Sequence, residues 1–153
     1  MEISYRIASI DDLMKIAELR DLMCRTEEYC GEDEYDEILI YNREALTNPE
    51  KAIFIAFDGE KAVGYSYVTT KHERSFSDEY GLYGCLDTIY VLSEYRRHGV
   101  AQTLVAMCED WAREKGCAEF TSGCELDNDR SFAFHIGIGF KEVIRIIHFS
   151  KKL

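Results

Sequence analysis

Residues 86 to 112 constrain the fold more than any other stretch, because they predict a strand, a basic turn and a helix in direct succession. Residues 86–91 are rich in the β-branched and aromatic types that favour strands. The turn Arg96-Arg97-His98-Gly99 follows. Beyond it, apolar residues recur at steps of three and four, typical of a helix with one core-facing stripe: Val100, Ala101, Leu104, Val105, Cys108, Trp111 and Ala112.

A helix that begins directly after such a turn offers an anion-binding site. Its first backbone N–H groups have no acceptor within the helix, and the helix dipole favours negative charge there. Gly99 would let the backbone approach a ligand closely. We therefore predict a ligand that carries phosphate. The alternative is a solvated Arg-Arg turn, since basic turns before helices are common.

The rest of the sequence predicts one mixed sheet flanked by helices. Ser9 with Asp12 is typical of a helix N-cap, and Asp58-Gly59 predicts a hairpin turn. The expected order is β-α-α-β-β-β-α-β-α-β, with a polar loop at 71–80. Strands are expected at 3–7, 52–57, 62–68, 82–91, 118–121 and 140–151 (the last as a strand or strand pair), and helices at 13–23, 35–47, 100–115 and 129–137.

Length and composition predict a single domain over residues 1–153, because 46% hydrophobic residues and one proline suit one core without a linker. No apolar run is long enough to span a membrane and the N-terminus lacks a signal-peptide pattern, so we expect a cytoplasmic protein without a membrane partner. The six cysteines form no Cys-x-x-Cys pair, which favours free thiols over disulfides. The four histidines do not pair with cysteines at ligand spacing, so no metal is expected.

The net charge of −11 argues against nucleic acid as a partner, because such proteins need a basic face. Acidic residues crowd into one short stretch, and two interpretations stay open. The stretch is either a solvated loop and helix start or a field that attracts a cationic substrate. Its members are Glu27, Glu28, Glu32, Asp33, Glu34, Asp36 and Glu37.

A second motif follows at residues 126–140. The pattern Arg-x-x-Gly-x-Ala at 96–101 and the pattern Asn-x-x-Ser-x-x-Phe-His-x-x-x-Gly-Phe at 128–140 together resemble the acetyl-coenzyme A motifs of the GNAT N-acetyltransferase superfamily. The resemblance covers nearly the whole chain and is greatest to the bacterial aminoglycoside 6'-N-acetyltransferases. Stretches that carry it are 89–91, 96–101, 109–112, 116–117, 125–128, His135 and 139–140.

The resemblance implies an α/β (α+β) fold with a mixed, mostly antiparallel twisted sheet. Coenzyme A would enter a V-shaped split between the strands at 86–91 and 118–121. Acetyl-CoA as co-substrate and a homodimer are further implications. The cofactor-binding residues would be Ile89, Tyr90 and Val91 along the pantetheine arm, Arg97, His98, Gly99, Val100, Ala101 and Gln102 at the pyrophosphate, and Asn128 beside the pantetheine.

Acetyl transfer to an amine needs a base for the amine and a proton for the departing thiolate. Asp87 is the candidate base, because burial within a strand would raise its pKa, and the alternative is a structural hydrogen-bond partner. Relatives usually carry a glutamate there, so Asp87 would act through water. His135 stands where most of the superfamily carries a tyrosine acid, and is the candidate acid. Packing against coenzyme A, or a tyrosine such as Tyr90 as the acid, stay open as alternatives.

The resemblance points to an aminoglycoside 6'-amine as the acceptor and to a role in antibiotic resistance. Candidate substrate-binding residues are Glu32, Asp33, Glu34, Asp87 and Glu125. Compared with those enzymes, the chain has Met23-Cys24 in place of a tryptophan, and Gly123 and Ile144 in place of acids. Another amine (a polyamine, amino sugar or peptide amine) therefore stays open as acceptor, as does a CoA-binding module without catalysis.

Overall fold

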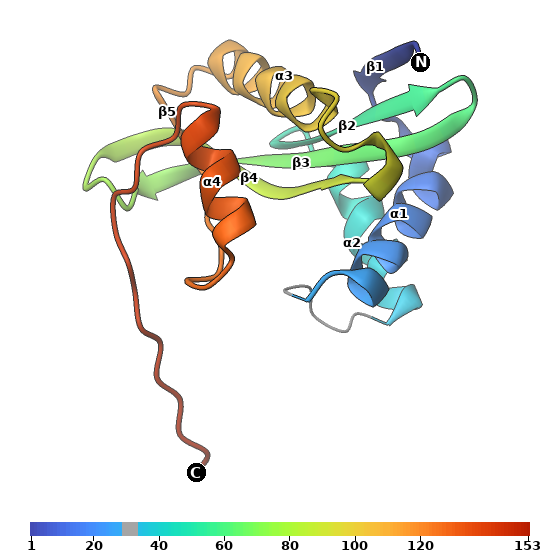
Figure 1. Cartoon of the computed structure of the whole chain (residues 1–153). Helices are drawn as coiled ribbons and strands as arrows, with labels where there is room; N and C mark the ends of the chain where they lie inside the picture. The colour runs from blue at the N-terminus through green and yellow to red at the C-terminus, as the bar shows by residue number, and fades with distance from the viewer. Residues whose placement is uncertain (29–33) are drawn as a thin grey trace.

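A five-stranded sheet forms the centre of the molecule in the computed structural model, which describes residues 1–28 and 34–153. The strands lie in chain order, with antiparallel pairing up to β4 and parallel pairing between β4 and β5. The long strands β3 and β4 run side by side across the molecule (Figure 1). The bounds are Ile3–Ile7 (β1), Lys51–Asp58 (β2), Lys61–Arg74 (β3), Tyr80–Val91 (β4) and Glu119–Thr121 (β5).

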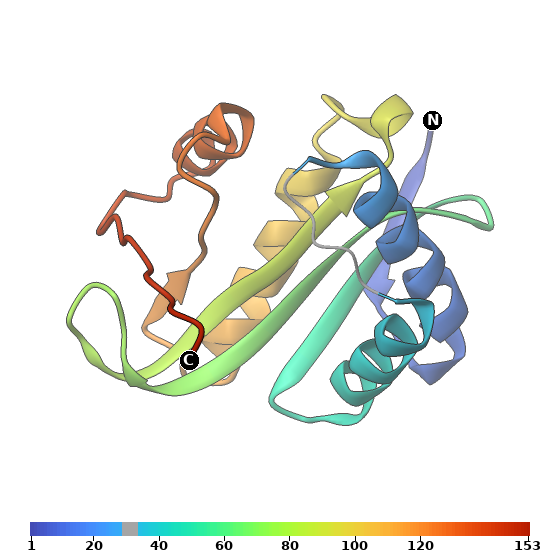
Figure 2. The ribbon, with the colours of Figure 1, turned by 90° about the horizontal axis from the view of Figure 1, so that it is seen from below.

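Helices cover both faces of this sheet. The helices α1 (Leu13–Thr26) and α2 (Tyr35–Thr47) lie on one face, and α3 (Val100–Glu114) lies on the other (Figure 1). A short helix, α4 (Asp129–Gly137), follows β5 and stands apart from the sheet (Figure 2). Within the described ranges, no helix is long and apolar enough to cross a membrane.

The core fixes α3 against the middle of the sheet. The apolar stripe of α3 is buried at Leu104, Val105 and Cys108, as its periodicity predicts. The one polar group that β3 sends into this contact, Ser66, has partners: the Cys108 thiol donates to its oxygen at 3.1 Å, and the Ser66 hydroxyl donates to the Leu104 carbonyl at 3.3 Å. Because α3 is anchored in this way, its first turn is held at the end of β4.

An ion pair ties β1 to the start of α1. Arg6 donates to both carboxylate oxygens of Asp12, at 2.7 and 2.8 Å, and the Ser9 N–H donates to the same carboxylate at 2.9 Å. The hydrogen bonds from Arg6 lower the pKa of this buried carboxyl to about 2. The predicted capping role of Ser9 and Asp12 is confirmed, with a short 3₁₀ turn, Ile10–Asp12, before α1.

Most predicted elements are confirmed, and the predicted mixed, mostly antiparallel sheet with flanking helices is present. The helices at 35–47 and 129–137 have the predicted bounds. The predicted polar loop at 71–80 is confirmed only for residues 75–79, because β3 continues to Arg74 and β4 begins at Tyr80. Many polar residues of this stretch lie at an exposed hairpin end. A strand that packs against no core there shows no alternation of apolar and polar side chains.

The predicted strand at 140–151 is wrong for the single chain. Residues 140–153 have no regular secondary structure and run away from the sheet (Figure 1). The neighbouring edge strand, β5, is only three residues long and offers this segment little to pair with. Several large apolar side chains of the segment are exposed in consequence: Val143, Ile144, Ile146, Ile147 and Phe149.

Candidate active site

The pairing of β4 with β5 stops after three residue pairs, the last of which is Cys85 with Thr121. β4 continues to Val91 without a neighbouring strand on that side, and the segment that follows β5 diverges from β4 (Figure 2). A cavity of about 880 Å³ opens there, between β4, α4 and the end of α1. Many of the predicted site residues line it: Asp87, Ile89, Tyr90, Val91, Arg97, Gly99, Val100, Ala101, Gln102, Glu125, Asn128 and His135.

One side of this cavity, which we call the cofactor wall, consists of residues 89–102. The first hydrogen bond of α3 runs from the Thr103 N–H to the Gly99 carbonyl at 3.0 Å, so the N–H groups of residues 100–102 precede the helical ladder. Gly99 has φ of 79° and Arg97 has φ of 66°, and these two left-handed residues turn the chain sharply into the helix. The exposed N–H groups at the helix start form a cradle that fits a pyrophosphate.

The strand part of the cofactor wall fits the pantetheine arm. Residues 89–91 are still extended and pair with β3 on one side, but they lie beyond the last pair with β5, so their other edge faces the cavity. An arm with amide groups can pair with such an edge. Asn128 lies across the cavity, where its side chain caps α4 by accepting from the Ser131 N–H at 3.1 Å. His98 is exposed and does not line the cavity.

Arg96 and Glu27 link the two sides of the cavity. The Arg96 guanidinium donates to the Val91 carbonyl at 2.8 Å and to Glu27 at 2.6 Å. Arg130, at the start of α4, donates to the other oxygen of Glu27 at 2.7 Å. Burial disfavours the Glu27 charge, but the hydrogen bonds from both arginines outweigh this and lower its pKa. We call this trio the Glu27 clasp.

Asp87 lies at a break in the β3–β4 register. Tyr67 pairs with Thr88 and Val68 pairs with Leu86, so Asp87 falls between the two pairs. The side chain is exposed in the open cavity, which corrects the prediction that it is buried within the strand. Desolvation by the surrounding protein nevertheless raises the pKa of Asp87, against a thiol hydrogen bond from Cys85 and the charge of Lys71. A carboxyl with a raised pKa suits a general base.

Two tyrosines flank Asp87 on the α2 side of the sheet. The rings of Tyr41 and Tyr67 meet edge to face, with centroids 5.4 Å apart. Desolvation, reinforced by the charge of Asp87, raises the pKa of Tyr67 to about 12 and also raises that of Tyr41. Both hydroxyls are therefore neutral hydrogen-bonding groups at physiological pH.

His135 is held on both ring nitrogens. Its Nδ1 lies 2.7 Å from the Ser131 carbonyl oxygen, and its Nε2 lies 2.7 Å from the Ser122 hydroxyl. The ring of Phe140 packs beside it, with centroids 5.2 Å apart. The imidazole therefore has a defined orientation at the edge of the cavity.

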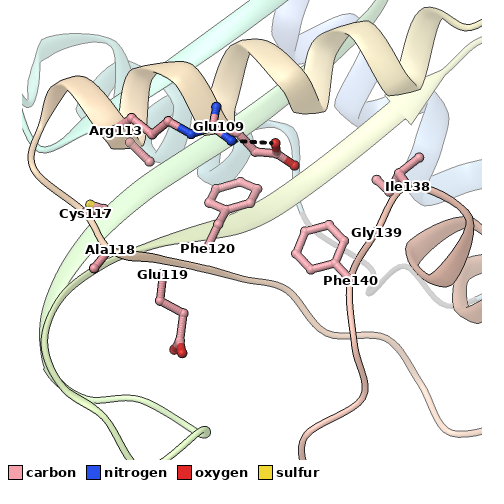
Figure 3. A pocket seen from close by; sticks show the side chains of 10 residues that line it. Glu109, Arg113, Cys117, Ala118, Glu119, Phe120, Ile138, Gly139 and Phe140 are labelled. Atoms are coloured by element: carbon pink, nitrogen blue, oxygen red, sulfur yellow. Dashed lines mark hydrogen bonds and ion pairs between the residues drawn. The ribbon is translucent and has the colours of Figure 1, made fainter.

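A smaller cavity, of about 280 Å³, lies under the C-terminal end of α3. Phe120 and Phe140 form its apolar side, with ring centroids 5.8 Å apart, and the Glu109–Arg113 pair lies at its rim (Figure 3). Over the described ranges, no cluster of His, Cys, Asp and Glu is arranged to hold a metal ion. Cysteines 24, 85, 108, 117 and 124 form no disulfide with one another, and Cys30 lies outside the described residues.

Comparison with known proteins agrees with this architecture. The sequence profile of the acetyltransferase (GNAT) family matches residues 16–140. The chain belongs to this family. It is 36% identical to aminoglycoside N(6')-acetyltransferase type 1 of Acinetobacter haemolyticus, over 65% of this chain and 68% of that protein. The Salmonella typhimurium enzyme of the same name is 31% identical, over 76% of this chain and 81% of its own.

Solved structures show the same fold over the whole chain. AAC(6')-Iy in complex with a bisubstrate analogue, CoA-S-monomethyl-acetylneamine, has a TM-score of 0.89, 27% identity and full coverage of both chains. AAC(6')-IG of Acinetobacter haemolyticus has a TM-score of 0.85 and 31% identity, over 100% of this chain and 99% of that one. The predicted GNAT fold is thereby confirmed, and the chain is an acetyl-CoA-dependent N-acetyltransferase.

We call the part of the cavity around Asp87 and Glu125, opposite the cofactor wall, the acceptor side. It differs most from the sequence prediction. Glu32 and Asp33 lie outside the described residues. Glu34 occupies the position before α2, is exposed and does not line the cavity, whereas Glu125 does. Sequence reasoning named Glu27 in the acidic stretch and Arg96 in the basic turn, but it missed their contacts with each other and with Arg130, because these partners come from distant elements. It also missed the Tyr41–Tyr67 pair beside Asp87 and the Ser122–His135 contact.

Proposed function

We propose that this enzyme transfers the acetyl group of acetyl-CoA to the 6'-amine of an aminoglycoside and so confers resistance to that drug. One observation carries the proposal: a single cavity joins the phosphate cradle of α3 to Asp87, a carboxyl with a raised pKa. Relatives named for aminoglycoside 6'-acetylation, at 31–36% identity, support the choice of acceptor.

The residues around the cavity divide the work of the reaction. The N–H groups of residues 100–102 and Arg97 bind the pyrophosphate, and the 89–91 backbone pairs with the pantetheine arm, which brings the thioester to the Asp87 end of the split. Asp87 accepts the proton of the substrate ammonium through a water molecule. The free amine then attacks the thioester carbon, the C–S bond breaks, and the departing thiolate takes a proton, assisted by His135.

The acceptor carries several ammonium groups besides the reacting one. Asp87 and Glu125 are carboxylates of the cavity that can meet them. Glu27 is already matched by two arginines, so it contributes little free negative charge to the acceptor. The acidic stretch at 27–37 therefore acts, in this proposal, through Glu28, Glu32, Asp33 and Glu34 as a steering field.

A matched pair of acceptors tests the proposal. The purified enzyme is incubated with acetyl-CoA and an aminoglycoside that bears a 6'-amine, and the release of free thiol is followed. The control is the analogue with a hydroxyl in place of that amine. We expect rapid release with the first and little with the second. Equal rates with both would contradict 6'-specificity, a preference for a polyamine would support the alternative acceptor class, and no release with any amine would support a CoA-binding module.

We further propose a cytoplasmic homodimer in which residues 140–153 of one chain complete the sheet of the other. The exposed apolar side chains of this segment and the short, open edge of β5 support the pairing. The cavity beside Phe120 and Phe140 lies next to that edge (Figure 3). Sedimentation should give a dimer for the full chain, and Ile144→Asp with Ile146→Asp should give monomers. A monomeric full chain would contradict this assembly.

A further inference from the structure

Ser122 stands at the apex of the split. It directly follows Thr121, the last residue of β5 to pair with β4, and directly precedes Gly123, which lines the cavity. The Thr121 hydroxyl donates to the Gly84 carbonyl at 3.1 Å and fixes the end of β5 there. Across the split lies the irregular stretch of β4 that contains Asp87. Ser122 is therefore placed where the two diverging segments are still close together, and its hydroxyl contacts His135.

The contacts of His135 determine what this hydroxyl can do. The Ser131 carbonyl oxygen, 2.7 Å from Nδ1, can only accept a hydrogen bond, so Nδ1 carries a hydrogen in the neutral and in the cationic ring. Nε2 is left to Ser122 at 2.7 Å. A neutral ring accepts the Ser122 O–H, whereas an imidazolium donates to the Ser122 oxygen and leaves the Ser122 O–H available to another acceptor.

We propose that Ser122 and His135 form a two-step proton relay to the thiolate of coenzyme A. When the C–S bond breaks, its electron pair stays on sulfur. The sulfur takes the hydroxyl proton of Ser122, and Ser122 Oγ takes the Nε2 proton of the His135 imidazolium. The ring becomes neutral and is reprotonated from solvent, while the amine proton leaves through Asp87. The relay rests on the acetyl transfer proposed above, but not on the identity of the acceptor.

The relay explains a feature that His135 alone does not. His135 lines the cavity, but one ring N–H is bound to a backbone carbonyl and the other nitrogen is engaged by the Ser122 hydroxyl. A histidine that gave its proton directly to sulfur would have to break the Ser122 contact. With Ser122 between them, the ring stays in the position that Ser131 and Phe140 define.

Two substitutions of Ser122 test the relay in single-turnover experiments that follow the release of coenzyme A. Ser122→Ala should lower the single-turnover rate roughly tenfold to a hundredfold, less than the full value of a general acid because water replaces it in part. The Kd of acetyl-CoA should stay within about twofold, because the backbone of the cofactor wall is unchanged. Ser122→Thr keeps a hydroxyl and should recover most of the rate. An unchanged rate in Ser122→Ala, or no recovery in a folded Ser122→Thr, would overturn the relay.

Three further readouts separate a relay from a merely structural contact. In H₂O/D₂O mixtures, a plot of the wild-type rate against deuterium content should be curved, because two protons move together. The same plot for Ser122→Ala should be a straight line. His135→Phe combined with Ser122→Ala should lose no more rate than the more damaging single change, because the two residues act as one unit. Additive losses or a straight wild-type line would contradict the relay.

The nucleophile distinguishes failure of the relay from failure of the proposed acceptor. The relay acts on the leaving sulfur. Ser122→Ala should therefore reduce three rates by the same factor: transfer to an aminoglycoside, transfer to a simple diamine, and the hydrolysis of acetyl-CoA by water. A loss confined to one nucleophile would overturn the relay. If aminoglycosides are not acetylated but the common factor persists with the other nucleophiles, the relay stands and only the acceptor is wrong.

Discussion

The two sides of the cavity are built in different ways. The cofactor wall is one continuous segment, residues 89–102, and its binding groups are largely backbone N–H groups at a helix start. The acceptor side brings together side chains from separate elements: Asp87 from β4 and Glu125 from the segment after β5. Backbone sites depend on where elements lie, whereas side-chain sites depend on the identity of each residue.

This difference accounts for where the chain keeps and where it changes the pattern of aminoglycoside acetyltransferases. The motif at 96–101 is complete, and its residues lie around one helix start. On the acceptor side, Gly123 and Ile144 replace acids, and of the three candidate substrate-binding carboxylates that the structure describes, Asp87 and Glu125 line the cavity and Glu34 does not. We therefore expect substitutions on the acceptor side to alter turnover and acceptor affinity, and substitutions in the cofactor wall to alter acetyl-CoA affinity.

The largest effect should come from Asp87→Asn. We expect turnover to fall by roughly 10²–10⁴-fold, the usual contribution of a positioned base. The KM for acetyl-CoA should change little, because Asp87 lies beyond the cofactor wall. Steady-state kinetics measure both quantities, and a comparable rise in the KM for acetyl-CoA would contradict the separation of the two sides.

The pH profile of the wild type gives a second reading of Asp87. The base must be ionised, so activity should fall as pH decreases through its folded pKa, which desolvation raises above the ordinary value. The acidic limb of kcat/KM should therefore lie above the ordinary aspartate range and vanish in Asp87→Asn. A limb that persists in the variant would assign it to another group.

In the cofactor wall, Gly99→Val should weaken acetyl-CoA binding roughly tenfold or more, which corresponds to a loss of about 1.4 kcal/mol or more of binding free energy. A side chain at Gly99 has open space but must adopt φ of 79° beside the phosphate cradle. Gly59→Val is a matched control, since Gly59 has φ of 60° and open space in a hairpin turn and does not line the cavity. Calorimetry should show lost affinity only for Gly99→Val, while both variants lose stability. Equal affinities would contradict the cradle.

The cofactor wall and the acceptor side also differ in how much of each could be predicted from the sequence. The 96–101 motif and the helix stripe of α3 predict the cofactor wall, because binding there needs only a helix start behind a strand. The Glu27 clasp and the Ser122–His135 contact join residues far apart in sequence, and no local pattern predicts them. The segment at 140–153 alternates like a strand, but a strand forms only where a neighbour exists, and the single chain offers only the short edge of β5.

The acceptor side can be divided by comparing Glu125→Gln with Glu34→Gln. Glu125 lines the cavity, so its loss should raise the KM for an aminoglycoside about tenfold, the lower end of a charge-assisted hydrogen bond of about 1.5–3 kcal/mol. Glu34 is exposed outside the cavity and should act only through its field. Its smaller effect should disappear at high ionic strength, because salt screens exposed charges beyond about 8–10 Å. Equal, salt-independent effects would contradict this division.

The smallest effect should come from Glu27→Gln, which tests whether the clasp belongs to the acceptor side at all. Two arginines already match the Glu27 carboxylate, so its loss should leave the KM for the acceptor within about twofold, well below a charge-assisted contact. Because Arg130 is largely exposed, the loss of unfolding free energy should be about 1 kcal/mol at neutral pH.

The clasp should also give this stability difference a pH dependence. The pKa of Glu27 is lower in the folded protein than its ordinary value of 4.5, so its contribution is complete above that pH and is lost as pH falls through the folded pKa. Urea unfolding of both proteins should therefore show a gap at pH 7 that closes under acidic conditions. A constant gap would contradict the contribution of the Glu27 charge to the clasp, whereas a tenfold rise in the acceptor KM would place Glu27 among the residues that bind the acceptor and extend that side of the cavity to the end of α1.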